Sequence, residues 1–227
     1  MITVPKTPRP PTLYKYFPPE RADIIRDLRV RFSPPSDFND TFDTRSLSQR
    51  VSPWARAAQD SLRNGLGVLC LAERADVHLM WVNYARNHTG FVLGFRTDLP
   101  FFDQDGRTLG KVDYNPPPVL SDPDENGCFY KSPDWNYEDE WRCVRRFRKS
   151  ESRLVEIDPT LVAEIIFGWL MEPGNVAKIT SCAERLKMSP RYYFSSPSFD
   201  QQKFVNIPKM VVPCEYCDGY GFRSEDR

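Results

Sequence analysis

The sequence lacks the features that mark membrane, secreted and strongly charged proteins. Its longest apolar run is Ile165 to Met171, far short of the roughly 20 residues that span a bilayer. The N-terminus has no apolar stretch of signal-peptide length. Lys plus Arg and Asp plus Glu each number 31, giving zero formal charge, which argues against a surface built throughout to hold nucleic acid or anionic lipid. We therefore expect a cytoplasmic protein with no membrane partner.

Common catalytic motifs are also missing. The chain has no P-loop, no G-x-G-x-x-G, no G-x-S-x-G and no H-E-x-x-H, which excludes the commonest nucleotide hydrolases, dehydrogenases, esterases and zinc proteases. With only His78 and His88, a histidine-based zinc site is not expected. Of the six cysteines, only Cys214 and Cys217 are close in sequence. One C-x-x-C pair is half of a structural zinc site, so zinc at that pair is left open, and otherwise no metal is expected.

What the sequence does contain indicates a globular fold. Hydrophobic residues make up 40% of 227 residues, enough for a sizeable core. The 21 prolines predict many loops and short elements. We expect an α+β fold in a single compact domain, with mixed or mainly antiparallel sheets flanked by helices. The domain covers about residues 12–209, after a flexible lead over 1–11 and before a C-terminal tail over 210–227 that carries the C-x-x-C pair.

Periodicity and turn residues give an approximate element order. Residues 162–167 are compatible with a strand or a helix. Helices are predicted over 20–28, 53–64, 77–87 and 175–188. Strands are predicted over 13–16, 29–32, 68–71, 90–95, 111–114, 140–147, 191–194 and 203–207.

The clearest candidate for chemistry is the stretch Trp135 to Arg142. In a strand, Glu138, Glu140 and Arg142 would share one face, with the two carboxylates roughly 6–7 Å apart. Such a pair can divide the work of stabilising a developing cation and orienting or deprotonating an attacking group. Alternatively, the glutamates could pair with Arg142 or Lys131 on a solvated face.

Three further clusters carry suitable residue types. At helical spacing Trp81, Tyr84 and His88 fall on one face, which suits either a core stripe or a binding surface. Asn39 and Asp40 could cap a turn through their own side chains or bind ribose hydroxyls. The basic residues from Arg142 to Lys149 could meet solvent, phosphate or nucleic acid.

The ordered motifs LYKY, FSPPSDFNDTFD, VLCLAE, MWVNYARNHTGF and WNYEDEWR resemble a widespread bacterial family catalogued as a domain of unknown function. The resemblance covers about residues 12–209. Three positions depart from the family pattern: Phe17, Thr41 and Asn83 stand where that family usually has Arg, Pro and His.

The motif layout also has a distant resemblance to ADP-ribosyltransferases. That resemblance implies an enzyme that consumes NAD as a substrate, of the kind found among toxins and phage-defence effectors, with a protein or nucleic-acid acceptor. It implies that Glu140 stabilises the ribosyl cation and that Glu138 orients or deprotonates the acceptor. Lys15 and Arg142 would then hold phosphates, and Tyr16, Trp81 or Tyr84 would stack on the nicotinamide or adenine. Asn39 and Asp40 would meet ribose hydroxyls, and His88 is a further candidate for substrate binding.

Two other function classes fit the same residues. A non-catalytic module could bind a nucleotide or nucleic acid with the same side chains. A metal-dependent nuclease could use Glu138, Glu140, Asp40 and Asp43 around a divalent ion.

Overall fold

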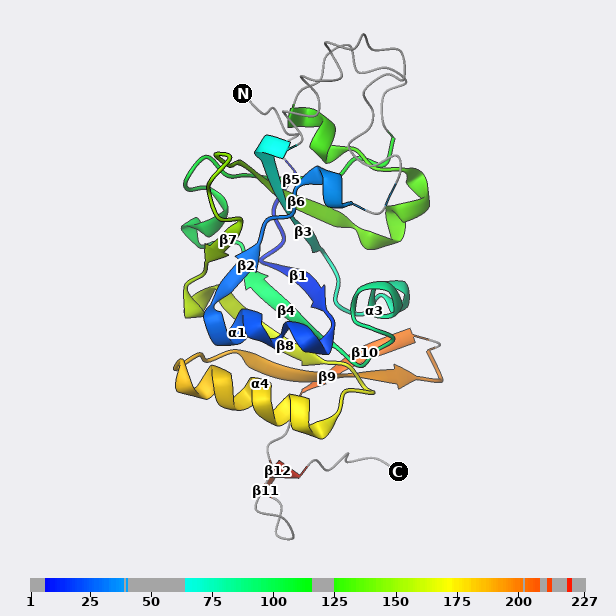
Figure 1. The fold of residues 1–227 in the computed structure, drawn as a ribbon. Helices are drawn as coiled ribbons and strands as arrows, with labels where there is room; N and C mark the ends of the chain where they lie inside the picture. The colour runs from blue at the N-terminus through cyan, green and yellow to red at the C-terminus, as the bar shows by residue number, and fades with distance from the viewer. Residues whose placement is uncertain are drawn as a thin grey trace. The chain divides into compact units, whose positions relative to one another are not determined.

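A computed structural model describes most of the chain, in two compact units that are taken one at a time below (Figure 1). Unit 1 comprises Met1–Leu13, Arg29–Arg74 and Arg96–Ile157, and unit 2 comprises Tyr14–Leu28, Ala75–Phe95 and Asp158–Arg227. The described residues are 7–38, 40, 64–115, 125–201, 203–208, 212–213 and 220–221. Among these residues, no helix is both long and apolar enough to cross a membrane.

Unit 1 is built around the antiparallel sheet β3-β6-β5. Two shorter strands, β2 and β7, form a separate antiparallel ladder. The strands of this unit are β2 (Arg29–Arg31), β3 (Leu66–Ala72), β5 (Thr108–Lys111), β6 (Glu140–Arg146) and β7 (Leu154–Glu156). Short 3₁₀ helices connect them: η2 (Pro35–Asp37), η3 (Pro100–Phe102), η4 (Glu125–Phe129) and η5 (Pro133–Glu138).

Unit 2 contains the strands β10-β9-β8-β4-β1 in that order. The β4–β8 and β9–β10 pairs are antiparallel, whereas β8 and β9 are parallel and are joined through α4. A helix is the usual crossover between parallel strands. The strands are β1 (Thr12–Phe17), β4 (Phe91–Arg96), β8 (Val162–Phe167), β9 (Arg191–Ser198) and β10 (Lys203–Pro208), with the short pair β11 (Val212–Pro213) and β12 (Tyr220–Gly221). The helices are η1 (Pro19–Ala22), α1 (Asp23–Asp27), α3 (His78–Tyr84), η6 (Pro159–Leu161) and α4 (Pro173–Arg185).

The two faces of the unit 2 sheet differ in character because side chains alternate along each strand. One face is aromatic and apolar: Phe17 stacks on Phe91, and Phe167 contacts the ring of Phe194 at 5.3 Å between centroids. The other face, called the polar face below, carries Tyr14 and Tyr16 of β1. On it the Tyr14 hydroxyl donates to Glu164 Oε2 at 3.1 Å.

The prediction of an α+β fold with mainly antiparallel strands is confirmed. The ambiguous segment 162–167 is the strand β8. Its β-branched residues suit a strand, and β4 and β9 pair with it on its two sides. The predicted strand 111–114 is largely wrong, since β5 covers Thr108–Lys111 instead. The predicted helix over 53–64 lies outside the described residues except for its last residue. Asn39, Asp43, Cys214 and Cys217 also lie outside them.

Candidate functional site

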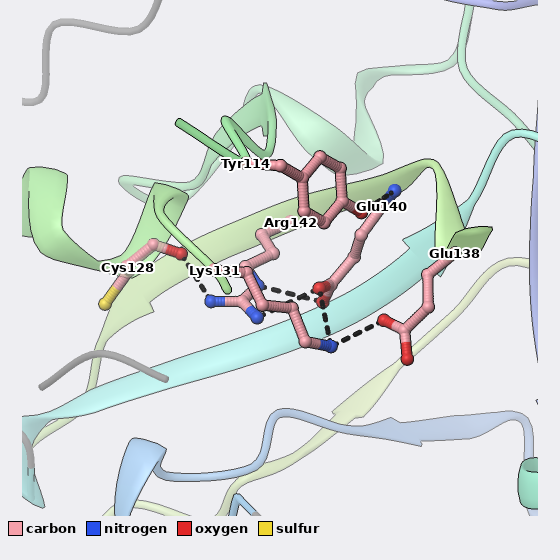
Figure 2. A network of polar contacts seen from close by, with 6 residues as sticks. All are labelled: Tyr114, Cys128, Lys131, Glu138, Glu140 and Arg142. Carbon is pink, nitrogen blue, oxygen red and sulfur yellow. Dashed lines mark hydrogen bonds and ion pairs between the residues drawn. The ribbon is translucent and has the colours of Figure 1, made fainter. Parts of the chain in front are cut away.

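Four charged residues of unit 1 form a buried group that we call the acid–base cluster: Lys131, Glu138, Glu140 and Arg142 (Figure 2). Lys131 lies between η4 and η5, Glu138 is the last residue of η5, and β6 begins at Glu140. Between the glutamates, Asp139 has a left-handed backbone with φ of 44°. Glu138 is therefore not part of a strand, and the predicted alternation of the two glutamates along one strand is wrong.

The ammonium of Lys131 nevertheless brings the two carboxylates together. Its Nζ lies 2.5 Å from Glu138 Oε2 and 3.2 Å from Glu140 Oε2. Arg142 holds Glu140 with both edges of its fork, through Nε to Oε1 at 2.8 Å and Nη2 to Oε2 at 2.9 Å. Such bidentate pairing fixes the carboxylate in direction as well as in place.

The surroundings of the acid–base cluster complete its polar contacts. Arg142 Nη1 donates to the Cys128 carbonyl at 2.7 Å, and the Glu140 amide donates to the Tyr114 hydroxyl at 2.9 Å. The Arg142 guanidinium lies over the ring of Phe38, and the Lys131 ammonium lies 4.8 Å from the centroid of the Trp135 ring. These cation–π contacts stabilise positive charge away from water.

All four charged residues are buried: Arg142 is 0% exposed, Glu138 and Glu140 are 3% exposed, and Lys131 is 6% exposed. Burial alone would raise the pKa of Glu140. The charges of Arg142 and Lys131, with hydrogen bonds from Arg142 and Cys70, outweigh burial and hold that pKa well below its usual value. Burial would likewise lower the pKa of Lys131, but the charges of Glu140 and Glu138 raise it overall. Glu140 and Lys131 therefore carry opposite charges at neutral pH.

The pairing of the glutamates with Arg142 and Lys131 was one of the two sequence expectations, and it is confirmed. The expectation that this pairing lies on a solvated face is wrong, because the group is buried. For Lys131 the sequence predicts only a role as a surface partner. No motif around it distinguishes a buried lysine from the exposed ones.

The polar face of unit 2 carries a second group, which we call the imidazole–aromatic cluster: Tyr16, His78, Trp81, His88 and Phe204. His88 is stacked between Trp81, at 5.6 Å and 9° between the rings, and Phe204, at 4.2 Å. His88 Nε2 lies 3.0 Å from His78 Nδ1. Burial, and then the charge of His78, lower the pKa of His88 to about 4.

Trp81 and His88 were predicted to share one face of a helix. Their rings do lie against each other, but His88 lies outside the helix. The predicted helix 77–87 ends at Tyr84. Arg86, Asn87 and His88 then follow with φ of 46°, 52° and 66°. Three consecutive left-handed residues without a glycine are costly, and such backbone strain is concentrated at functional sites.

The remaining predicted site residues are dispersed. Lys15 lies over the ring of Phe17, on the opposite face of β1 from Tyr16, so the polar face that holds Tyr16 and Trp81 does not include Lys15. Tyr84 is half-buried at the end of α3. Asp40 is half-buried in unit 1.

The acid–base cluster differs from a divalent metal site. The position between the two carboxylates is taken by the Lys131 ammonium. In the described part of the chain, no three His, Cys, Asp or Glu side chains come together in a way that could hold a metal ion.

Comparison with known proteins found no match: no family model, no curated protein and no solved structure resembles the chain at a significant level.

Proposed function

We propose that the protein is an NAD-consuming enzyme of the ADP-ribosyltransferase class, in which the acid–base cluster supplies the catalytic carboxylates. The observation that carries the proposal is the convergence of Glu138 and Glu140 on one buried ammonium. A buried ion group is weak evidence for stability, because well-packed apolar residues in its place are often neutral or stabilising. We infer that the charges have a chemical use.

Cleavage of the nicotinamide–ribose bond places positive charge on the ribose C1′ and its ring oxygen. An ionised carboxylate fixed in a site of low dielectric stabilises that charge without having to reorganise. Glu140 meets this description, since Arg142 binds both of its oxygens and its pKa is held low. We assign Glu138 to orienting the acceptor or removing its proton.

Arg142 has a positioning role in this proposal. Its guanidinium is fully buried and is directed at Glu140 and the Cys128 carbonyl. We therefore revise the expectation that it holds a phosphate of NAD.

The test compares wild type with Glu140→Gln, Glu138→Gln and, as matched control, Glu156→Gln. Glu156 is a glutamate of the same unit, 78% exposed and paired with Arg29. Each variant is incubated with labelled NAD, alone and with protein or nucleic-acid acceptors, and nicotinamide release and label transfer are measured. Circular dichroism verifies that each variant is folded.

We expect Glu140→Gln to lower the rate of nicotinamide release about 10²–10³-fold, while Glu156→Gln matches wild type. No release from wild type, or equal release from Glu140→Gln, would overturn the proposal. In that case, an NAD-dependent rise in melting temperature in both proteins would identify a binding module instead.

A further inference from the structure

The strand β10 lies at one end of the unit 2 sheet, and β9 is its only strand partner in the described part of the chain (Figure 1). The inner strands β4 and β8 are almost entirely buried, whereas every residue of β10 is half-buried or exposed. A strand at the end of a sheet presents backbone N–H and C=O groups that a further strand can bind. β10 therefore offers an edge for strand pairing.

Two prolines establish which backbone groups of β10 point outward. In an antiparallel ladder, opposed residues alternate between pairs that exchange two hydrogen bonds and pairs that exchange none. Phe204 is opposite Pro197, and Pro208 is opposite Tyr193. Neither proline has an N–H, so both of these pairs are of the kind without hydrogen bonds. The two pairs agree with one alternation, because Phe204 and Pro208 are four positions apart.

The same alternation assigns the remaining residues of β10. Those at odd positions exchange hydrogen bonds with β9, whereas Phe204 and Asn206 direct their backbone groups away from it. Each of these two residues carries one N–H and one C=O. Pro208 is also directed outward but has no N–H. The complete set of donors and acceptors at this edge is therefore centred on Val205.

These outward groups are complementary to a second copy of themselves. When a second β10 runs antiparallel with its Val205 opposite the first, Phe204 lies opposite Asn206 of the other copy on both sides of a twofold axis. Both of these pairs then exchange two hydrogen bonds, which satisfies every outward N–H and C=O of Phe204 and Asn206. A register centred on Asn206 would instead place the Phe204 carbonyl opposite Pro208, which has no N–H to donate.

The side chains of β10 suit the same pairing. The stretch from Phe204 to Ile207 contains no charged residue, so a second copy brings no like charges into the central pairs. Ile207, which is 49% exposed, would lie opposite Lys203 of the other copy, whose aliphatic stem can cover it while the ammonium stays in water. The β9–β10 ladder runs from Lys203 to Pro208 without a register shift, so β10 lacks the bulge that turns many edges away from partners.

We propose that unit 2 pairs with a second copy of this chain through β10, in an antiparallel ladder centred on Val205 that continues the sheet of one copy into that of the other. Strand addition of this kind gives affinity through main-chain hydrogen bonds and specificity through the side chains beside them. The same patch is used by both copies, as in other twofold dimers. No residue of the acid–base cluster takes part, so the dimer is independent of NAD cleavage.

The test measures the oligomeric state of the full chain by sedimentation velocity over a range of protein concentrations. Val205→Lys and Val205→Glu are examined separately and as an equimolar mixture, because the proposed ladder sets residue 205 directly opposite its own copy. The matched control is Leu154→Lys. Leu154 is a strand residue of unit 1 and is 47% exposed, so this variant adds the same charge away from β10. Circular dichroism verifies that each variant is folded.

We expect wild type to form dimers whose fraction rises with protein concentration. Val205→Lys and Val205→Glu should each raise the dissociation constant about 5–10-fold, because like charges directly opposite each other are destabilising. The mixture should recover most of this loss, since it pairs opposite charges. Leu154→Lys should dimerise as wild type does.

Amide hydrogen exchange of wild type, followed residue by residue by NMR, tests the ladder without any variant. The amides of Phe204 and Asn206 should exchange more slowly as the protein concentration rises, because their hydrogen bonds form only in the dimer. The amides of Val205 and Ile207 are bonded to β9 within each copy, so they should be protected at every concentration. If a Val205 variant does not fold, this measurement decides.

A wild type that is monomeric at every concentration overturns the proposal, and the edge is then open to a strand of a different protein. The proposal is also overturned if Val205→Lys dimerises as wild type does, if the mixture dimerises no better than either variant, or if Leu154→Lys weakens the dimer equally. A dimer in which Phe204 and Asn206 exchange at the same rate at all concentrations overturns it as well. Glu140→Gln should dimerise as wild type does, so loss of NAD turnover and loss of dimerisation are separate results.

Discussion

The acid–base cluster of unit 1 and the polar face of unit 2 treat buried polar atoms in opposite ways. In the acid–base cluster each charged side chain contacts one of opposite sign, and Arg142 binds Glu140 through both Nε and Nη2. On the polar face, His88 Nδ1, Ser195 Oγ and Asn206 Oδ1 have no partner among the described residues. The physical costs account for this difference. An uncompensated buried charge costs far more than a domain can bear, whereas an unsatisfied neutral group costs only about 1–3 kcal/mol.

The two regions therefore differ in what their buried polar atoms contribute. A fully paired ion group has its geometry fixed in advance, which is the condition for stabilising a developing charge. A neutral polar atom without a partner instead leaves a cost that the surrounding packing must offset. We therefore expect substitutions in unit 1 to act on stability and rate, and substitutions beside His88 to act on stability.

The largest effect is expected from Lys131→Met. It leaves Glu138 and Glu140 buried beside one cation instead of two, so the free energy of unfolding should fall by about 3–5 kcal/mol. Urea denaturation measures this change. Lys131→Met with Glu138→Gln removes one charge of each sign and should recover at least half of the loss.

The matched control for Lys131→Met is Arg29→Met, which breaks the exposed pair Arg29–Glu156, with side chains 49% and 78% exposed. Exposed pairs contribute about 0–1 kcal/mol, so this variant should be close to wild type. If Lys131→Met lowered the free energy of unfolding no more than Arg29→Met does, the acid–base cluster would contribute no more to stability than an exposed ion pair.

A smaller effect is expected in unit 2 from Gly168→Ala. The added methyl group would meet the His88 carbonyl oxygen at 2.1 Å, the His88 carbonyl carbon at 2.7 Å and the Gly90 oxygen at 2.9 Å. All three are backbone atoms that cannot rotate away, so thermal denaturation should show a loss of about 1–3 kcal/mol.

Gly174→Ala supplies the control for Gly168→Ala. Gly174 lies in the first turn of α4, and no atom would lie within 4 Å of its added methyl group. Alanine is favoured over glycine in helices by about 0.5–1 kcal/mol, so stability should rise. Equal behaviour of the two variants would mean that the packing between Gly168 and His88 is not tight.

The sequence predicts different parts of this molecule unequally. The strand β6 and the helix α4 follow from local pattern, whereas that pattern does not decide between strand and helix for the residues of β8. The pairing of Glu140 with Arg142 also follows from the sequence, since opposite charges close in sequence pair readily. The resemblance to ADP-ribosyltransferases and the roles that it implies remain predictions.

The remainder depends on long-range contacts that no local pattern encodes. In the sequence Lys131 resembles any surface lysine. It is buried because of how the segment between η4 and η5 folds. The left-handed residues at 86–88 end a helix where propensity would have continued it, because tertiary contacts override propensity. Phe204 reaches His88 from a strand 116 residues further along the chain. Alternation along β1, in contrast, is a local pattern that places Lys15 and Tyr16 on opposite faces.

The smallest expected effect concerns acid stability, where the two regions should respond in different pH intervals. The ordinary pKa of His88 is 6.5, and in the folded protein it is lowered to about 4. The unfolded chain therefore binds a proton that the folded one does not, so stability is complete above pH 6.5 and declines as the pH falls toward 4. The pKa of Glu140 is lowered from an ordinary 4.5, so its contribution is lost only as the pH falls below 4.5.

His88→Asn separates the two intervals, since asparagine tolerates a left-handed backbone and does not titrate. We expect this variant to lose about 1–2 kcal/mol less stability than wild type between pH 7 and pH 4.5, measured by urea denaturation at each pH. Glu140→Gln should keep the wild-type decline over that interval and change it only at lower pH. If the decline between pH 6.5 and pH 4.5 were the same in His88→Asn as in wild type, the imidazole of His88 would be as readily protonated in the folded chain as in the unfolded one.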